Sequence, residues 1–253
     1  MKNQKYDIDE STRVNIQEEN DNESGVLFAV RESYRTIRTN VIMSVIKSGC
    51  KKIIFTSAVP GEGKTTTVTN VALSLAQTDL KVLLIDTDLR KARIHRMLKL
   101  PNTPGLSNVL GGFCSLDEAI NKTKHQNLDV LCAGRNVPNP AELLTSELMV
   151  EMMAELEKRY DFILLDSTPV NVVSDVFPLV KITDGVVIVT RQMYSTHVEL
   201  QKALESLKFI EAKILGVVLN SVEYETKSKR YGSYGKYGGY GYGNYGNNYS
   251  SEN

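Results

Sequence analysis

The chain has 253 residues, of which 42% are hydrophobic and 24% are charged. This length suits one large α/β domain or two small ones, and the composition excludes a chain that is disordered throughout. Thirty basic residues balance thirty acidic ones, so the net charge gives no overall attraction to nucleic acid or to an anionic membrane. The twelve tyrosines are unevenly placed, because seven of them fall in the last 23 residues.

The N-terminal residues 1–24 carry seven acidic side chains and few apolar ones, so we expect a disordered acidic arm. They form no apolar signal core, and residue 2 is lysine rather than the glycine that myristoylation requires. No apolar run approaches the ~18 residues of a membrane span, and three widely spaced cysteines fit reduced, buried thiols in the cytosol. We expect a cytoplasmic protein, recruited to the inner face of the cell membrane through a partner.

Residues 25–223 alternate between helical and strand-like patterns. After a helix at 26–47, apolar runs typical of strands occur at Lys52–Thr56, Val82–Asp86, Leu128–Cys132, Phe162–Asp166, Val186–Thr190 and Ile214–Leu219. Helical stretches lie between most of them, at Thr65–Gln77, Ala141–Arg159, Asp175–Lys181 and Thr196–Phe209. Near-continuous apolar strands alternating with helices predict an α/β fold, with a parallel sheet covered by helices on both faces. The remaining residues 224–253 are rich in Tyr and Gly and form a flexible tail, which gives a single domain with flexible termini.

A phosphate-binding loop is predicted at residues 58–65, Ala-Val-Pro-Gly-Glu-Gly-Lys-Thr, between a strand and a helix. Its glycines let backbone N–H groups turn towards phosphate oxygens at the N-terminus of the helix. Lys64 would reach the β- and γ-phosphates of ATP, and the Thr65 hydroxyl would bind Mg²⁺. The residues expected to bind ATP through this loop are Gly61, Glu62, Gly63, Lys64, Thr65 and Thr66.

Three aspartates lie at or just after the ends of two buried strands: Asp86, Asp88 and Asp166. Ligands bind at this edge of a parallel sheet. A single aspartate there would merely start a turn. Three aspartates beside a phosphate-binding loop instead favour the binding of a magnesium-nucleotide complex and its reaction. We assign Asp88, Asp166 and Thr65 as ligands of Mg²⁺, because this ion prefers oxygen ligands. Asp86 is then free to accept a proton from the nucleophile. Arg90 pairs either with a phosphate or with a carboxylate.

These motifs, together with the tyrosine-rich tail, resemble the bacterial tyrosine kinases, a P-loop family of polysaccharide co-regulators. The likeness is to the Gram-positive type, in which the kinase domain is a separate cytosolic chain. It covers the chain from about residue 32 to the C-terminus. The residues that carry it are the loop at 58–65, the segment Leu83–Arg90 and the strand that ends in Asp166. The resemblance implies a P-loop NTPase-like fold and a protein-tyrosine kinase.

The resemblance also implies that Asp86 is the catalytic base, beside Lys64 and Asp88, with ATP and Mg²⁺ as cofactors. It implies autophosphorylation of the tail, largely between subunits of a ring, and a role in capsule or exopolysaccharide synthesis. Expected partners are a transmembrane activator or adaptor of that synthesis, a cognate tyrosine phosphatase and further copies of the chain, with no nucleic acid. The expected phosphorylation sites are Tyr231, Tyr234, Tyr237, Tyr240, Tyr242, Tyr245 and Tyr249.

Two further elements match the family. Glu32, Arg35 and Arg38 share one face of a helix because they are three residues apart. In the family such a face pairs with the next subunit, whereas spacing alone favours local pairing along the helix. Asn220, at the end of the last strand, resembles the residue that meets the adenine ring, although an asparagine there could also form a turn.

Other functions compete with the kinase. A partitioning or positioning ATPase uses ATP as a dimerisation switch, but its signature lysine is replaced here by Val59. An ATP-regulated binding module that gates a membrane polymerase is a second alternative. The Tyr/Gly tail could stack on single-stranded RNA, yet its only basic residue after Tyr231 is Lys236.

Overall fold

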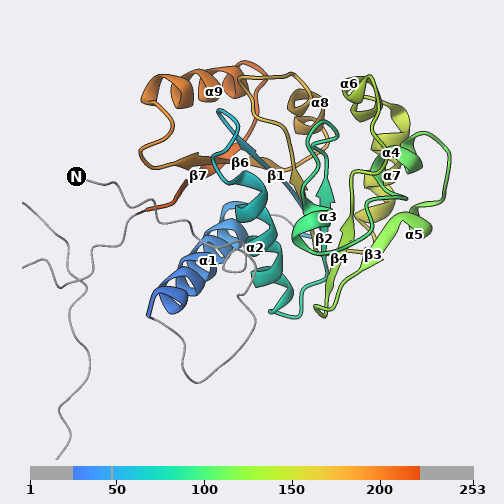
Figure 1. Cartoon of the computed structure of the whole chain (residues 1–253), viewed down its shortest axis with the longest axis horizontal. Coiled ribbons are helices and arrows are strands. Elements are labelled where there is room, and N and C mark those ends of the chain that lie inside the picture. Colours follow the sequence, from blue (N-terminus) through green and yellow to red (C-terminus); the bar gives the residue numbers. More distant parts are fainter. Residues whose placement is uncertain (1–24, 47, 223–253) are drawn as a thin grey trace, which may run out of the picture. The chain divides into compact units, whose positions relative to one another are not determined.

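Seven strands form one sheet in the order β3-β4-β2-β5-β1-β6-β7 (Figure 1). This computed structural model describes residues 25–46 and 48–222; the expected acidic arm and tyrosine-rich tail lie outside them. All neighbouring strands are parallel except β3 and β4, which are antiparallel. The strands are β1 Lys51–Ser57, β2 Val82–Asp86, β3 Ile120–Lys122, β4 Leu128–Leu131, β5 Phe162–Asp166, β6 Gly185–Arg191 and β7 Ile214–Asn220.

Helices cover both faces of the sheet, as the sequence predicts, because successive residues of a strand point to opposite faces. On β1, Ile53 and Phe55 pack with α1 and α2, whereas Ile54 packs with α7, α8 and α9 on the other side. Figure 1 shows α1 and α2 side by side, away from α8 and α9. The helices are α1 Gly25–Ser44, α2 Lys64–Ala76, α3 Ile94–Met97, α4 Leu106–Leu110, α5 Leu116–Ala119, α6 Pro140–Leu144, α7 Glu147–Leu156, α8 Val176–Val180 and α9 His197–Phe209.

The structure corrects the helix expected at 141–159, which is two helices, α6 and α7. Ser146 separates them because its hydroxyl accepts a hydrogen bond from the backbone N–H of Met149 at 3.3 Å and caps α7. The short elements α3, α4, α5 and β3 were not predicted. The edge strand β3 has only three residues, none of them buried, so it lacks the apolar run that identifies the central strands.

An apolar core lies on each face of the central strands, and every residue of β2 and β5 is buried. Two of the three cysteines, Cys50 and Cys132, are buried, as the sequence predicts. Burial raises the pKa of the Cys132 thiol to about 12, with a smaller contribution from the charge of Asp86. None of the helices within the described ranges is long and apolar enough to cross a membrane.

Candidate active site

The strand order brings the predicted site residues to one edge of the sheet. β5 lies between β1 and β2, and Asp86 of β2 is directly opposite Asp166 of β5. Phe55 of β1, just before the phosphate-binding loop, is also opposite Asp166. The carboxyl ends of three adjacent parallel strands therefore place this loop beside Asp86, Asp88 and Asp166.

Two glycines shape the phosphate-binding loop. Gly61 and Gly63 have φ angles of 89° and 88°, a left-handed conformation that favours glycine. Both are also closely approached from the β6–β7 side of the sheet. A Cβ atom on Gly63 would lie 2.0 Å from Nδ2 of Asn220, and one on Gly61 would lie 2.8 Å from Oη of Tyr194. Only glycine fits at these positions with the loop in this shape.

Residues after β6 and at the end of β7 hold the same loop in place. The buried Glu62 carboxylate accepts hydrogen bonds from the backbone N–H of Val59 at 2.7 Å and from the Ser195 hydroxyl. Asn220 Nδ2 donates to the Glu62 carbonyl at 2.9 Å, and Tyr194 Oη donates to the Pro60 carbonyl at 3.1 Å. The Glu62 side chain is therefore occupied by Val59 and Ser195, which leaves its backbone N–H for phosphate.

Lys64 bridges two of the three aspartates. Its Nζ lies 3.1 Å from Oδ2 of Asp88 and 3.2 Å from Oδ1 of Asp166. Burial alone would lower the pKa of Lys64, but the charges of Asp166 and Asp88 outweigh it and raise the pKa above its usual value. A lysine that stays charged at this position suits the binding of anionic phosphate groups.

Asp86 is fully buried and differs from its neighbours in its contacts. Its Oδ2 accepts hydrogen bonds from the backbone N–H groups of Arg93 and Ile94, both at 3.1 Å. Its Oδ1 is buried without a hydrogen-bond partner. Burial, and then the charge of Asp166, raise the pKa of Asp86 to about 7. Such a carboxyl group changes its protonation state near neutral pH, as a general base requires.

The residues expected to hold Mg²⁺ fit a divalent cation that also binds phosphate. Oδ2 of Asp166 is buried without a hydrogen-bond partner, and Asp88 lies across Lys64 from it. Burial raises the pKa of Asp166, although Lys64 and the Thr65 hydroxyl act in the opposite direction. Within the described ranges, no group of three or more His, Cys, Asp or Glu side chains could hold a metal ion by itself. Mg²⁺ at a nucleotide needs fewer, because phosphate and water supply its other ligands.

Arg90 pairs with a carboxylate rather than pointing freely towards the site. Its Nε and Nη2 donate to the two oxygens of Asp175, at 2.6 and 3.0 Å. Asp175 is only 2% exposed, so this two-point contact joins the segment after β2 to the start of α8. Of the two predicted pairings of Arg90, the structure contains the one with a carboxylate.

A cavity of about 1050 Å³ opens at this edge of the sheet. The phosphate-binding loop, with Thr66, forms one side, and Asp88 and the residues around α3 form another. Residues 123–125, 168–169 and 172–173 complete the lining. This volume is sufficient for a nucleotide together with part of a peptide.

The described residues of the predicted interface helix contribute nothing to the lining of this cavity. Glu32 and Arg35 pair with each other on α1 at 2.6 Å, which is the local pairing that spacing alone favours. Arg38 donates to the Ser74 carbonyl of α2 at 3.0 Å, so it holds α1 against α2. The seven tail tyrosines lie outside the described residues.

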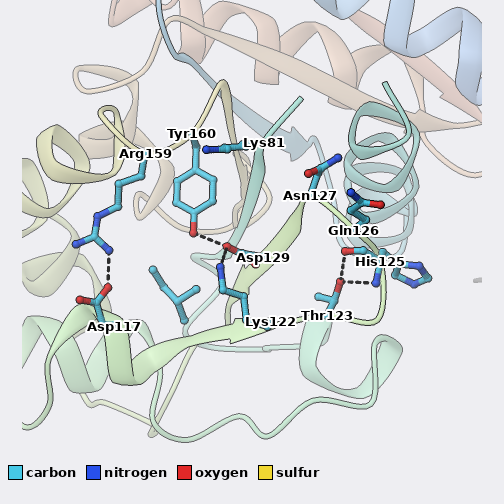
Figure 2. A pocket seen from close by; sticks show the side chains of 11 residues that line it. Lys81, Asp117, Lys122, Thr123, His125, Gln126, Asn127, Asp129, Arg159 and Tyr160 are labelled. Atoms are coloured by element: carbon cyan, nitrogen blue, oxygen red, sulfur yellow. Dashed lines mark hydrogen bonds and ion pairs between the residues drawn. The ribbon is translucent and has the colours of Figure 1, made fainter. Parts of the chain in front are cut away.

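A second pocket, of about 620 Å³, lies at the opposite edge, where β2, β4 and β5 begin (Figure 2). Several of its polar side chains bond with one another. Asp129 accepts from Lys122 at 2.6 Å and from Tyr160 at 2.7 Å, and Arg159 donates to Asp117 at 2.5 Å. These contacts pair the charged groups of Asp117, Lys122, Asp129 and Arg159.

The fold and the loop define a P-loop protein of the nucleotide-binding class. Residues 50–217 match the family described as an AAA domain. Tyrosine-protein kinase YwqD of Bacillus subtilis (strain 168) is 40% identical over 201 residues, which cover 79% of this chain and 84% of the relative. Putative tyrosine-protein kinase CapB of Staphylococcus aureus is 35% identical over 202 residues, covering 80% and 89%.

Solved structures agree with these relatives. The crystal structure of the chimerical protein CapA2B2 has a TM-score of 0.77 and 34% identity, covering 84% of this chain and 91% of its own. The septum site-determining protein MinD of Pyrococcus horikoshii OT3, complexed with Mg-ADP, is more distant, with a TM-score of 0.58, 27% identity and coverage of 67% and 70%. The chain therefore belongs to the bacterial tyrosine kinase family, as the sequence motifs indicate, rather than to the positioning ATPases.

Proposed function

We propose that this chain is an ATP-dependent protein-tyrosine kinase that phosphorylates tyrosines in the C-terminal segment of neighbouring copies. The observation that carries the proposal is the arrangement at the edge of the sheet. A buried carboxyl group with a pKa of about 7 and one unpartnered oxygen, Asp86, lies opposite a lysine–aspartate cluster at a phosphate-binding loop. The relatives named tyrosine-protein kinases support the same reaction.

In the proposed reaction, ATP phosphates lie in the loop, where backbone N–H groups and Lys64 bind the β- and γ-phosphates. Thr65, Asp88 and Asp166 would hold Mg²⁺, which would supply positive charge against the negative charge that develops on the phosphates. The tyrosine oxygen forms a bond to the γ-phosphorus while the bond from phosphorus to the β–γ bridging oxygen breaks and ADP leaves. The phenolic proton passes to Oδ1 of Asp86. Because this transition state is loose, Asp86 mainly orients the phenol, and full deprotonation before the transfer is unnecessary.

The proposed biological role is regulation of capsule or exopolysaccharide synthesis. The expected partners are a transmembrane activator or adaptor, which would bring the chain to the inner face of the membrane, and a cognate tyrosine phosphatase. We place Glu32, Arg35 and Arg38 at the interface of a ring. Their present contacts, within α1 and with α2, would have to be exchanged or shared when another subunit binds. Asn220, beside the loop, is the proposed adenine contact.

The decisive experiment incubates the full chain with γ-labelled ATP and Mg²⁺ and maps the labelled residues by mass spectrometry. Tail tyrosines should be labelled in the wild type, whereas Lys64→Met and Asp86→Ala should give no label. The activating partner is added in a parallel reaction. ATP hydrolysis without phosphotyrosine, with the partner present, would contradict the proposal and favour an ATP-driven switch.

A further inference from the structure

The cavity at the nucleotide edge continues beyond the phosphate-binding loop as a groove along α3. Basic side chains dominate its lining, and among the described lining residues only Asp88 is acidic. Two of the lining cations, Lys64 and Arg90, are paired with aspartates. The other five, which we call the basic row, are Lys91, Arg93, Arg96, Lys99 and Lys124.

The side chains of the basic row have no carboxylate partner in the described part of the chain. They are all exposed, and the ion pairs formed by residues 25–46 and 48–222 include none of them. Burial and the positive charge of the row lower the pKa values of two histidines beside it. Burial, and then the charge of Arg96, lower the pKa of His95, and burial followed by Lys124 does the same to His125. The groove therefore presents a concentrated and uncompensated positive charge.

The row begins next to the candidate base. The backbone N–H of Lys91 donates to Asp88 Oδ1 at 2.9 Å and that of Arg93 to Asp86 Oδ2 at 3.1 Å, which fixes the start of the row at the candidate site. Arg96 follows one turn later and Lys99 another turn later, since their N–H groups donate to the carbonyls of Arg93 and Arg96. At about 1.5–2 Å per residue, six residues of such a helix and its end span about 9–12 Å.

The tyrosine spacing of the tail corresponds to this length. Tyr231, Tyr234, Tyr237 and Tyr240 follow one another in steps of three residues, which is about 10 Å in an extended chain. The segment 231–253 carries one lysine and one glutamate, so it is almost uncharged until it is modified. Each phosphate then adds about −1.5 to −2 charges. A basic groove would therefore bind the modified segment and largely ignore the unmodified one.

We propose that the basic row binds phosphotyrosines already formed on the tail of a second copy, one tyrosine step from the tyrosine that reacts. This inference rests on the proposed function and specifies how the same site holds its substrate. Arginine and lysine bind phosphate through charge-assisted hydrogen bonds. The first phosphate then holds the tail while later tyrosines reach Asp86, so that phosphorylation of one tail continues without release.

Binding is measured first, without ATP. Fluorescence anisotropy follows a labelled peptide of residues 231–253, with phosphotyrosine at positions 234 and 237 or without it, added to the full chain with all seven tail tyrosines changed to Phe. The phosphopeptide should bind at least about 10-fold more tightly than the unmodified peptide, and added salt should weaken it. Equal binding of the two peptides would overturn the proposal.

Charge reversal locates the binding surface. The triple variant Arg96→Glu, Lys99→Glu, Lys124→Glu should bind the phosphopeptide at least about 10-fold more weakly. The matched control Lys202→Glu, Lys208→Glu, Lys213→Glu makes the same charge change at exposed positions on and after α9 and should alter binding less than about 2-fold. A neutral triple variant, with glutamine at 96, 99 and 124, serves if the reversed chain unfolds by circular dichroism. The same loss in the control would overturn the proposal.

A competition experiment tests whether another anion, either the N-terminal acidic segment or RNA, binds the basic row better than the phosphopeptide does. A peptide of residues 1–24, which carries seven acidic residues, and single-stranded poly(U) are added separately to the bound phosphopeptide. Either competitor displacing it at a lower concentration than unlabelled phosphopeptide would overturn the proposal, in favour of the acidic arm or of nucleic acid.

A time course then tests whether one tail is phosphorylated repeatedly without release. The same Phe-tailed chain phosphorylates the Lys64→Met chain with its natural tail, and intact masses are recorded. Multiply phosphorylated tails should appear while unmodified tails remain, and the basic-row variant should instead accumulate singly phosphorylated tails. The absence of any phosphotyrosine would refute the proposed function, whereas phosphotyrosine with the same distribution for both enzymes would refute only the role of the basic row.

Discussion

The two edges of the sheet carry polar pockets that differ in how their charges are satisfied. At the amino edge, Lys122 and Tyr160 both donate hydrogen bonds to Asp129 (Figure 2). At the carboxyl edge, Asp86 and Asp166 each keep one buried oxygen without a partner, and these are the only unpartnered buried carboxylate oxygens in the described ranges. Since buried polar groups are almost always hydrogen-bonded, unsatisfied carboxylates distinguish a ligand site better than the presence of a polar cavity does.

The largest expected effect is that of Lys64→Met. It removes the cation between Asp88 and Asp166 and the contact to the transferred phosphate, so phosphotyrosine formation should fall at least about 100-fold. The rate is measured by mass spectrometry, with thermal unfolding as a check on the fold. Lys122→Met removes the comparable ion pair at the amino edge and should leave the rate within about 2-fold. A similar loss in both variants would remove the functional distinction between the edges.

Asp86→Asn should reduce the rate of phosphoryl transfer about 100-fold or more and should stabilise the fold at pH 8. The folded pKa of about 7 lies above the unfolded value of 3.8, so the wild type loses stability as the pH rises from about 4 through 7, and the amide does not. We expect the Asp86→Asn variant to be more stable than the wild type by about 1–3 kcal/mol at pH 8, with the difference vanishing near pH 4.

Urea unfolding at several pH values measures this difference. Asp129→Asn, at the amino edge, is the matched control. It removes the negative charge that accepts hydrogen bonds from Lys122 and Tyr160 and should destabilise the chain. If Asp86→Asn instead proves less stable than the wild type at pH 8, burial does not disfavour the Asp86 charge.

Asn220→Ala removes the hydrogen bond from Nδ2 to the Glu62 carbonyl and the contact that encloses Gly63. The loss of one such bond, at about 0.5–1.5 kcal/mol, should weaken ATP binding about 2- to 12-fold, as isothermal titration calorimetry would show. Asn121→Ala removes an equivalent bond to the Ala119 carbonyl far from the loop and should leave the affinity unchanged. Unchanged ATP affinity in Asn220→Ala would contradict a role for Asn220 at the nucleotide site.

The smallest expected effect is that of Tyr160→Phe at the amino edge. Burial, together with the hydrogen bond to Asp129, raises the pKa of Tyr160 well above its usual value. The hydroxyl thus stays a donor, and losing it should cost about 0.5–1.5 kcal/mol of unfolding free energy with no change in kinase rate. A reduced rate would assign a catalytic role to the amino edge.

Sequence patterns located the central strands and the three aspartates because these depend on local order. β2 and β5 begin and end where their apolar runs do, and a strand end fixes where an aspartate lies. The contacts of Glu62 with Ser195 and of Arg90 with Asp175 were not predictable, since they join segments far apart in the chain. Tyr194 and Ser195 gave no signal, because nothing in their local sequence indicates that the turn after β6 reaches the loop.

Truncation experiments must take account of how near Asn220 is to the tail. β7 ends at Asn220, and the tail begins only four residues later in the predicted organisation. A deletion that keeps residue 222 preserves the side chain that contacts the phosphate-binding loop, whereas one that ends at 219 removes it. Deletions made a few residues too early would therefore weaken nucleotide binding and wrongly suggest that the tyrosines themselves bind ATP.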